Sequence, residues 1–184
     1  YTVVQSQSKF LIALDQSGPI NYGEMLIEAG GQLTEGGYLQ TIVMLGEQIP
    51  DSINWSAMLE KGATVSDEEL EARSSKVNVE DRMMLAYTSG TTGHPKGVVH
   101  CHKPVRNTYE RAMLLGHNRN DVHMSYLPLF HAYGFSEVAM MAGLTGGSQV
   151  LFDVFEADEV LEAVEVEGGT VLHGFDSHWA DLIR

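Results

Sequence analysis

The sequence predicts an α/β fold with a mostly parallel sheet and flanking helices. Short apolar, β-branched runs alternate along the chain with segments whose apolar residues recur at helical spacing. Glycine or proline lies at many of the junctions, as expected where an element ends. Hydrophobic residues make up 43% of the 184 positions, which is enough to bury an ordinary core. Because strands separated by helices favour right-handed crossovers, we expect the strands to pair in parallel.

In the first half of the chain we expect strands at residues 9–14, 40–45 and 82–88. We expect helices there at residues 22–33, 54–60 and 66–73. The apolar face of the first helix carries Met25, Leu26 and Ala29. The apolar face of the second helix carries Trp55, Met58 and Leu59, which we expect to point inward. The third helix begins with Ser66 and has Glu69 three residues later, which fits a capping box on a charged, solvated helix.

In the second half we expect strands at residues 122–127, 149–152 and 170–173. We expect helices there at residues 104–115, 133–144, 156–166 and 176–184. Pro128 ends the first of these strands, since proline cannot donate to a sheet. The helix over residues 156–166 carries Ala157, Leu161 and Val164 on one face. Asp176 or Ser177 is expected to cap the last helix.

Charge and cysteine content exclude several classes of protein. The formal net charge is −14, and so acidic a surface repels the phosphate backbone of nucleic acids. Cys101 is the single cysteine, so no intrachain disulfide can form, which fits a reducing compartment such as the cytoplasm. No run of roughly 18 apolar residues is present, so we expect no transmembrane span. The start of the chain does not read as a signal peptide.

Both ends of the chain look cut. It opens at Tyr1 without a methionine and stops at Arg184 inside a predicted helix that has no glycine or proline stop signal. We therefore expect the 184 residues to be a piece of a longer protein.

Residues 87–97 read YTSGTTGHPKG, a composition suited to wrapping a polyphosphate. Glycines allow backbone N–H groups to approach oxygens closely, hydroxyls donate hydrogen bonds, and Lys96 adds a positive charge. The segment is not a P-loop, because Gly97 stands where that motif has Ser or Thr, and it is not G-x-G-x-x-G. The competing interpretation is a surface hairpin turn that is simply rich in Gly and Thr.

Residues 127–135 read LPLFHAYGF and form the second candidate motif. A histidine at a strand-to-helix turn, here His131, can donate a hydrogen bond to a carboxylate. Gly134 would leave room for a substrate chain to enter. The competing interpretation is a buried histidine satisfied by backbone groups, beside an aromatic residue, Tyr133, that belongs to the core.

A protein-bound metal is not expected. His100 and His102 would face the same side of a strand, with Cys101 between them. No third or fourth ligand follows at a known spacing, so these residues do not predict a metal site.

Together the two motifs resemble those of the adenylate-forming superfamily, and in particular its acyl-CoA synthetase branch. Residues 87–97 match its phosphate-loop signature at every fixed position, and His102 matches the histidine that follows the signature. The second motif of that branch, Leu-Pro-x-Phe-His-x-x-Gly, is met by residues 127–134. The resemblance covers nearly the whole chain and implies a middle portion of the large N-terminal domain. The adenine-binding turn, the ribose aspartate and the small C-terminal domain would then follow residue 184.

The resemblance also implies roles for single residues. Lys96 would balance charge on the leaving pyrophosphate, and His131 would stand at the junction between the nucleotide and the acyl pocket, so these two carry the catalytic roles. Tyr133 and Gly134 would line the acyl pocket. The β- and γ-phosphates of ATP would be wrapped by Thr88, Ser89, Gly90, Thr91, Thr92 and Gly93.

Residues 152–179 resemble the strand–helix–strand segment that follows the second motif in synthetases. Relatives mostly have a proline in the turn where this chain has Gly174-Phe175-Asp176. The departure leaves open whether Phe175, His178 and Trp179 line the acyl pocket or belong to the core.

The implied function of the full-length protein is that of an AMP-forming acid–thiol ligase. It would activate a fatty, aromatic or alicyclic acid with ATP and Mg²⁺ and pass the acyl group to coenzyme A. The 184-residue piece alone would not turn over, because the catalytic lysine of the C-terminal domain lies outside it. Gly97 argues against an unrelated NTPase or kinase. A non-catalytic nucleotide-binding or interaction module remains the alternative.

Overall fold

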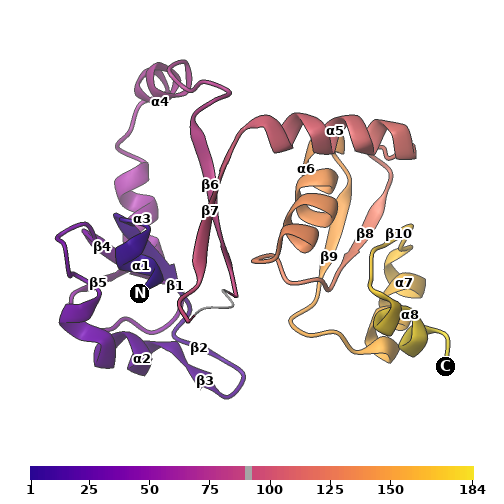
Figure 1. The fold of residues 1–184 in the computed structure, drawn as a ribbon, viewed down its shortest axis with the longest axis horizontal. Helices are drawn as coiled ribbons and strands as arrows, with labels where there is room; N and C mark the ends of the chain where they lie inside the picture. The colour runs from indigo at the N-terminus through magenta and orange to yellow at the C-terminus, as the bar shows by residue number, and fades with distance from the viewer. Residues whose placement is uncertain (90–92) are drawn as a thin grey trace. The chain divides into compact units, whose positions relative to one another are not determined.

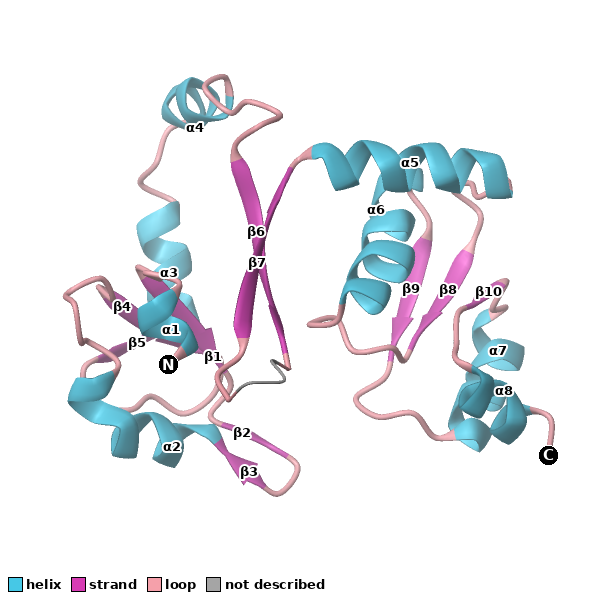
Figure 2. Cartoon of the chain, in the orientation of Figure 1, coloured by secondary structure: helices cyan, strands magenta, loops and turns pink. Residues whose placement is uncertain are grey.

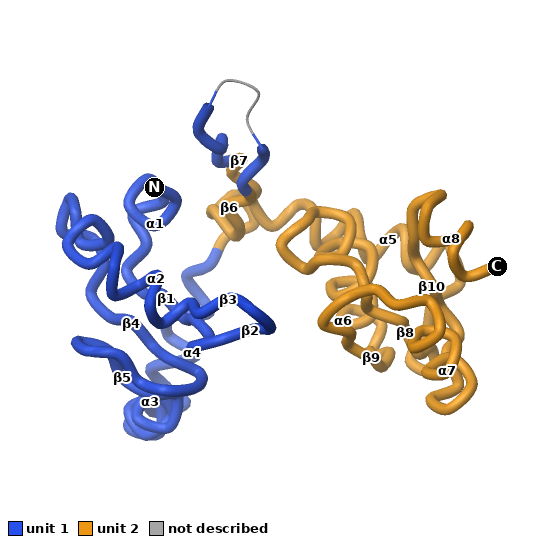
Figure 3. Tube along the Cα trace, turned by 90° about the horizontal axis from the view of Figure 1, so that it is seen from below, with its two compact units in different colours: residues 1–77, 87–97 blue, residues 78–86, 98–184 orange. Residues whose placement is uncertain are grey.

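The computed structural model describes residues 1–89 and 93–184. The chain is divided into two compact units (Figure 3). Unit 1 comprises Tyr1–Val77 with Tyr87–Gly97, and unit 2 comprises Asn78–Ala86 with Val98–Arg184. No helix among the described residues is long and apolar enough to cross a membrane.

Unit 1 is built on a three-stranded parallel sheet in the order β1-β4-β5 (Figure 1). Its strands are β1 (Phe10–Ala13), β4 (Thr41–Met44) and β5 (Ser52–Asn54). Val43 and Met44 of the central strand are fully buried, as expected for a strand covered on both faces. The parallel pairing confirms the predicted strands at residues 9–14 and 40–45, while β5 was not predicted.

Three helices of unit 1 begin at side-chain caps that the sequence supplies. The elements are α1 (Thr2–Gln5), α2 (Tyr22–Ala29), η1 (Gly30–Gln32), α3 (Trp55–Gly62) and α4 (Asp67–Ser74), with the hairpin strands β2 (Gln16–Ser17) and β3 (Ile20–Asn21). Asn54 Oδ1 accepts the Ala57 N–H at 2.8 Å, and Ser66 Oγ accepts the Glu69 N–H at 3.2 Å. Each bond satisfies an N–H that the first helical turn leaves unpaired.

Strands β6 (Arg82–Thr88) and β7 (Lys96–Cys101) form a separate two-stranded sheet (Figure 2). The bounds of β6 match the predicted strand. Strand β7 was not predicted, because its sequence, KGVVHC, shows no clear alternation of apolar and polar residues.

Unit 2 is built on a second parallel sheet, in the order β10-β8-β9. The strands are β8 (Val122–Ser125), β9 (Ser148–Leu151) and β10 (Val171–Leu172). The surrounding helices are α5 (Lys103–Leu115), the π-helical segment η2 (Tyr133–Met140), α6 (Met141–Thr145), α7 (Ala157–Glu167) and α8 (Asp176–Leu182). Strand β8 contacts η2 and α7, so helical segments cover the central strand (Figure 2). Parallel strands with flanking helices confirm the predicted α/β fold class.

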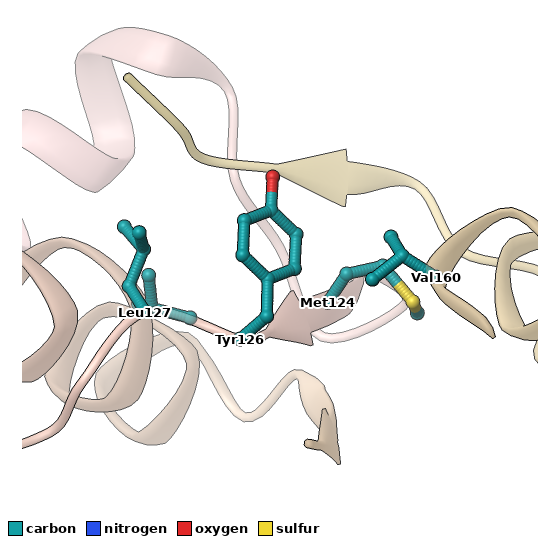
Figure 4. Close-up of a cluster of buried hydrophobic side chains, with 5 residues drawn as sticks. Met124, Tyr126, Leu127 and Val160 are labelled. Carbon is teal, nitrogen blue, oxygen red and sulfur yellow. The ribbon is translucent and has the colours of Figure 1, made fainter. Parts of the chain in front are cut away.

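The core of unit 2 is a cluster of buried side chains from β8, the chain that follows it and two helical segments (Figure 4). Met124 and Val160 are fully buried, and Tyr126 and Leu127 are nearly so. Val138 of η2 completes the cluster. Burial of such side chains is the main favourable contribution to the stability of this unit.

Three details of the sequence reading were wrong. Trp55 and Leu59 were expected to point inward but are 42% and 56% exposed. On α7 it is Val160, not the neighbouring Leu161, that enters the core, since the rotation of a helix about its axis is fixed by its packing partners. The cap of α8 is Phe175, whose N–H donates to His178 Nδ1 at 3.0 Å, so neither Asp176 nor Ser177 has that role.

The Tyr126 hydroxyl is a buried polar group without a hydrogen-bond partner among the described residues. The ring rises from the end of β8 towards β10 (Figure 4). A Cβ placed on Gly174 would lie 3.2 Å from the hydroxyl oxygen. Burial, followed by the nearby Tyr133, raises the pKa of Tyr126 to about 12. An unpaired buried hydroxyl costs free energy, whereas a phenyl ring of the same shape does not.

We expect Tyr126→Phe to raise the free energy of unfolding by about 1 kcal/mol at neutral pH, because the unpaired hydroxyl is removed. The raised pKa means that ionisation of Tyr126 opposes folding: the wild type has no such penalty below the unfolded pKa of about 10 and loses stability as the pH rises towards 12. The free energy of unfolding of the variant should therefore exceed that of the wild type by a growing amount between these pH values. Urea unfolding of both proteins at pH 7 and pH 11 measures the difference, and equal stabilities at both pH values would contradict it.

Candidate functional site

The glycine-rich segment, residues 87–97, joins β6 to β7 within unit 1. Thr88 is the last residue of β6 and Lys96 is the first residue of β7. Thr88 and Ser89 are exposed, and no hydrogen bond joins their hydroxyls to another described residue. Gly93 has φ = +115°, a conformation that glycine adopts far more readily than any other residue. Gly90, Thr91 and Thr92, which the sequence assigns to the phosphate site, lie outside the described residues.

Helix α1 holds both sides of the glycine-rich segment. The Tyr87 hydroxyl donates to the Thr2 carbonyl at 3.3 Å and also bonds the Gln5 side chain. The ring of His94 stacks on Tyr1 with ring centroids 4.6 Å apart and planes 13° from parallel. These contacts position the segment through residues more than 80 positions earlier in the chain, and sequence reading had no signal for them.

Lys96 is exposed and has no salt bridge with any described carboxylate. Lys103, seven residues later, instead pairs with Glu80 at 2.9 Å, and this hydrogen bond and charge raise the pKa of Lys103. Among these two lysines, therefore, Lys96 is the one whose ammonium group is not committed to a protein carboxylate. In a chain with net charge −14, such a lysine can attract an anion.

In unit 2, the turn between β8 and η2 fixes the ring of His131. The His131 N–H donates to the Pro128 carbonyl at 3.0 Å, and His131 Nδ1 accepts the Tyr133 N–H at 3.1 Å. Because Nδ1 is an acceptor, the proton of the neutral ring lies on Nε2. The side chain is exposed, so Nε2–H can donate to a ligand, which is the chemistry that the sequence predicted for this residue.

Aromatic side chains stand beside His131. The Phe175 ring meets Tyr133 edge-on at 5.2 Å between centroids, and it meets His131 in the same way at 6.5 Å. Phe175, whose role the sequence left open, is 50% exposed and so remains accessible. The ring of His178, also left open, lies 4.6 Å from that of Phe155 and 5.7 Å from that of Phe175. Phe175 therefore lies with the candidate site, and Trp179 is 37% exposed.

Tyr133 also lines a groove between α5 and η2. The groove has a volume of about 410 Å³. Its other lining residues are Pro104, Asn107, Thr108, Arg111, Ala132, Ser136 and Glu137. The Arg111 side chain pairs with Glu137 at its edge. On the other side of Tyr133 lies His173, with ring centroids 6.0 Å apart, and burial lowers the pKa of His173 to about 4.

The space beside Gly134 is occupied by the chain itself. A Cβ at this position would lie 2.4 Å from the Pro128 carbonyl oxygen and 2.7 Å from the Leu127 carbonyl oxygen. Glycine is therefore needed for the close approach of two backbone segments. The role of Gly134 in leaving room for a substrate chain stays a prediction.

Comparison with known proteins agrees with this fold. The profile of the family described as AMP-binding enzyme matches residues 1–184. The chain is 30% identical over 186 residues to the putative acyl-CoA synthetase YngI of Bacillus subtilis, covering 95% of this chain and 34% of that protein. It is 27% identical over 183 residues to the acyl-CoA ligase sidI of Aspergillus fumigatus, covering 95% and 30% respectively.

Among solved structures, the ATP-bound MatB of Rhodopseudomonas palustris has the same fold. The TM-score is 0.71 at 20% sequence identity, and the match covers 100% of this chain and 33% of MatB. The chain thus spans about a third of the length of these three relatives. Since the family profile covers every residue, the chain belongs to the AMP-binding enzyme family.

Proposed function

We propose that this chain supplies the phosphate-binding loop and part of the acid-binding pocket of an AMP-forming acid–thiol ligase. The observation that carries the proposal is the uncommitted lysine, Lys96, beside exposed hydroxyls in a motif that matches the family signature at every fixed position. The relatives YngI and sidI, named an acyl-CoA synthetase and an acyl-CoA ligase, support this reaction class. The substrates are a carboxylic acid, ATP and coenzyme A.

The residues that bind the phosphates of ATP come from residues 87–97 in unit 1. The hydroxyls of Thr88 and Ser89, with those of Thr91 and Thr92 by sequence, donate to the phosphate oxygens, and Lys96 adds a positive charge. The segment contains no carboxylate. Mg²⁺ would therefore be bound mainly through the phosphates of ATP and water, as this cation usually is.

The residues that bind the acid substrate come from unit 2. The Nε2–H of His131 donates to the carboxylate of the acid substrate, and its orientation is set by the bond at Nδ1. Tyr133 and Phe175 supply an apolar wall next to it, which suits the non-polar part of a fatty or aromatic acid. Gly134 contributes by letting η2 approach the turn before it.

The proposed reaction has two steps. A carboxylate oxygen attacks the α-phosphorus of ATP, the bond to the β-phosphate oxygen breaks, and acyl-adenylate and pyrophosphate form. The thiolate of coenzyme A then attacks the acyl carbon and AMP leaves. Charge develops on pyrophosphate in the first step, so fixed donors and Lys96 would stabilise that transition state. The single half-buried cysteine fits a cytoplasmic enzyme.

Carboxylate-dependent exchange between ATP and labelled pyrophosphate tests the proposal. The protein at its natural length is assayed with short, medium, long and aromatic acids, each with and without Mg²⁺. We expect exchange with one class of acid, followed by thioester formation when coenzyme A is added. A folded protein that binds ATP but shows no exchange with any acid would instead be a non-catalytic nucleotide-binding module.

A further inference from the structure

Three histidines and one aspartate gather in unit 2 where α5 ends and β8 begins. One ring nitrogen of His117, one of His123 and one carboxylate oxygen of Asp121 all lie within 4.8 Å of one another. His117 Nδ1 is 2.9 Å from Asp121 Oδ2. Ring centroids are 5.3 Å apart for His117 and His123, and the ring of His173 lies 6.3 Å from each of them. We call these four residues the histidine cluster.

The local backbone brings the cluster together. Gly116 ends α5 with φ = +82°, and the chain turns back so that Asp121 Oδ2 accepts the Asn118 N–H at 3.0 Å. In the sheet, His123 is in register with Val171. His173 follows β10 directly, and its ring plane lies 4° from parallel to that of His123.

The buried imidazoles of the cluster lack partners. His123 is fully buried, and neither of its ring nitrogens has a hydrogen-bond partner among the described residues. His173 Nε2 is likewise buried and unpaired within that part of the chain. A buried nitrogen without a partner costs free energy, so each such group needs an explanation, and a bound ion is one of the few available.

We propose that the histidine cluster is a structural zinc site, with His117, Asp121 and His123 as ligands and His173 as the fourth. Three imidazole nitrogens and one carboxylate oxygen are a donor set suited to tetrahedral Zn²⁺. Two imidazoles on one zinc have ring centroids about 5 Å apart, given Zn–N lengths of about 2.0–2.1 Å. His117 and His123 already have this separation, and His173 reaches it by a shift of about 1 Å, a small side-chain movement.

The charge state of the cluster is compatible with a cation. Burial lowers the pKa of His123 and of His173, and the neutral imidazole is the form that binds a metal. Burial opposes ionisation of Asp121, but hydrogen bonds from Asn118 and His117 outweigh it and lower the pKa of that carboxyl group. The site would join the end of α5 to β8 and β10, and zinc bound only by the folded state would stabilise unit 2.

The test uses the protein at its natural length, stripped with a chelator and titrated with Zn²⁺ against a chromogenic chelator. Co²⁺ substitution reports geometry, because a tetrahedral site absorbs visible light far more strongly than an octahedral one. Asp121→Asn and His117→Gln remove one ligand each and keep a polar side chain at positions whose side chains are 16% and 11% exposed. His123→Gln is added, although its fully buried position makes it the variant most prone to unfolding. His100→Gln is the matched control, since it removes a histidine outside the cluster.

We expect one zinc per chain, a strong tetrahedral Co²⁺ spectrum and a melting temperature that rises with Zn²⁺. Asp121→Asn and His117→Gln should each weaken binding at least about 10-fold, while His100→Gln should not change it. Circular dichroism of the metal-free variants establishes that they are folded. Absence of a stoichiometric zinc, an octahedral Co²⁺ spectrum, or unchanged affinity in both folded variants would overturn the proposal.

Discussion

Replacing Lys96 with alanine is expected to lower the rate of carboxylate-dependent ATP–pyrophosphate exchange by about 10²–10³-fold, the usual effect of removing one donor to a developing charge. Lys96 is exposed at the start of β7 and has no described carboxylate as a partner. Its removal should therefore leave the fold intact. Since the charge on pyrophosphate grows in the transition state, we expect kcat to fall more than the KM for ATP rises.

The matched control for this experiment is Lys103→Ala. Both substitutions remove one positive charge from a chain of net charge −14, so they alter the overall field equally. Lys103, however, is held by Glu80 in an exposed salt bridge, which contributes little to stability. We expect Lys103→Ala to keep the wild-type exchange rate. Equal losses in both variants would mean that net charge matters and that Lys96 has no local role, and a normal rate in Lys96→Ala would exclude the proposed function of this residue.

The strands that could be predicted are those whose burial dictates their composition. Strand β4 is central in its sheet, so its sequence, TIVM, reads as a nearly continuous apolar or β-branched run. Strand β7 lies in a two-stranded sheet, where Val98 and Val99 are 39% and 55% exposed. Its residues are little constrained by packing, and only pairing with β6 makes the segment a strand, which no local pattern could reveal.

In the candidate site, too, some residues could be predicted from the sequence and others only from the structure. The composition of residues 87–97 and 127–135 was sufficient to select Lys96 and His131 as candidates, because short motifs carry their chemistry locally. The bracing contacts from Tyr1 and Gln5, and the placement of Phe175 beside Tyr133, depend on tertiary structure. In the histidine cluster, the spacing of His117, Asp121 and His123 is visible in the sequence, but His173 is joined to them only by the register of β10 with β8.

The second large effect is expected from Gly134→Ala, which should destabilise unit 2 by about 3 kcal/mol, the upper end of the usual cost of overpacking. The new methyl carbon would lie 2.4 Å from the Pro128 carbonyl oxygen, 2.7 Å from that of Leu127 and 2.8 Å from the Pro128 carbonyl carbon. All three are backbone atoms, so no side-chain rotation can relieve the contact. The Pro128 carbonyl is also held by the His131 N–H at 3.0 Å, so the shift would reach the candidate site.

Gly143→Ala is the matched control, because it makes the same chemical change nine residues later in the same helical run. Gly143 is exposed in α6, and a Cβ there would meet no atom within 4 Å. Alanine has a higher helix propensity than glycine, so this variant should be neutral or gain up to about 1 kcal/mol. The same substitution is thus expected to lower stability at Gly134 and to leave it unchanged or raise it at Gly143.

Urea unfolding gives the stability of each variant, and hydrogen exchange of peptides covering residues 126–140 locates the change. For Gly134→Ala we expect a lower unfolding midpoint and lost protection in those peptides, since η2 must move away from the turn that carries His131. A stable Gly134→Ala variant with unchanged protection would mean that η2 and the preceding turn are not in close contact. The orientation of His131 would then have to come from its own hydrogen bonds at Nδ1 and N–H, without support from the helix packed behind it.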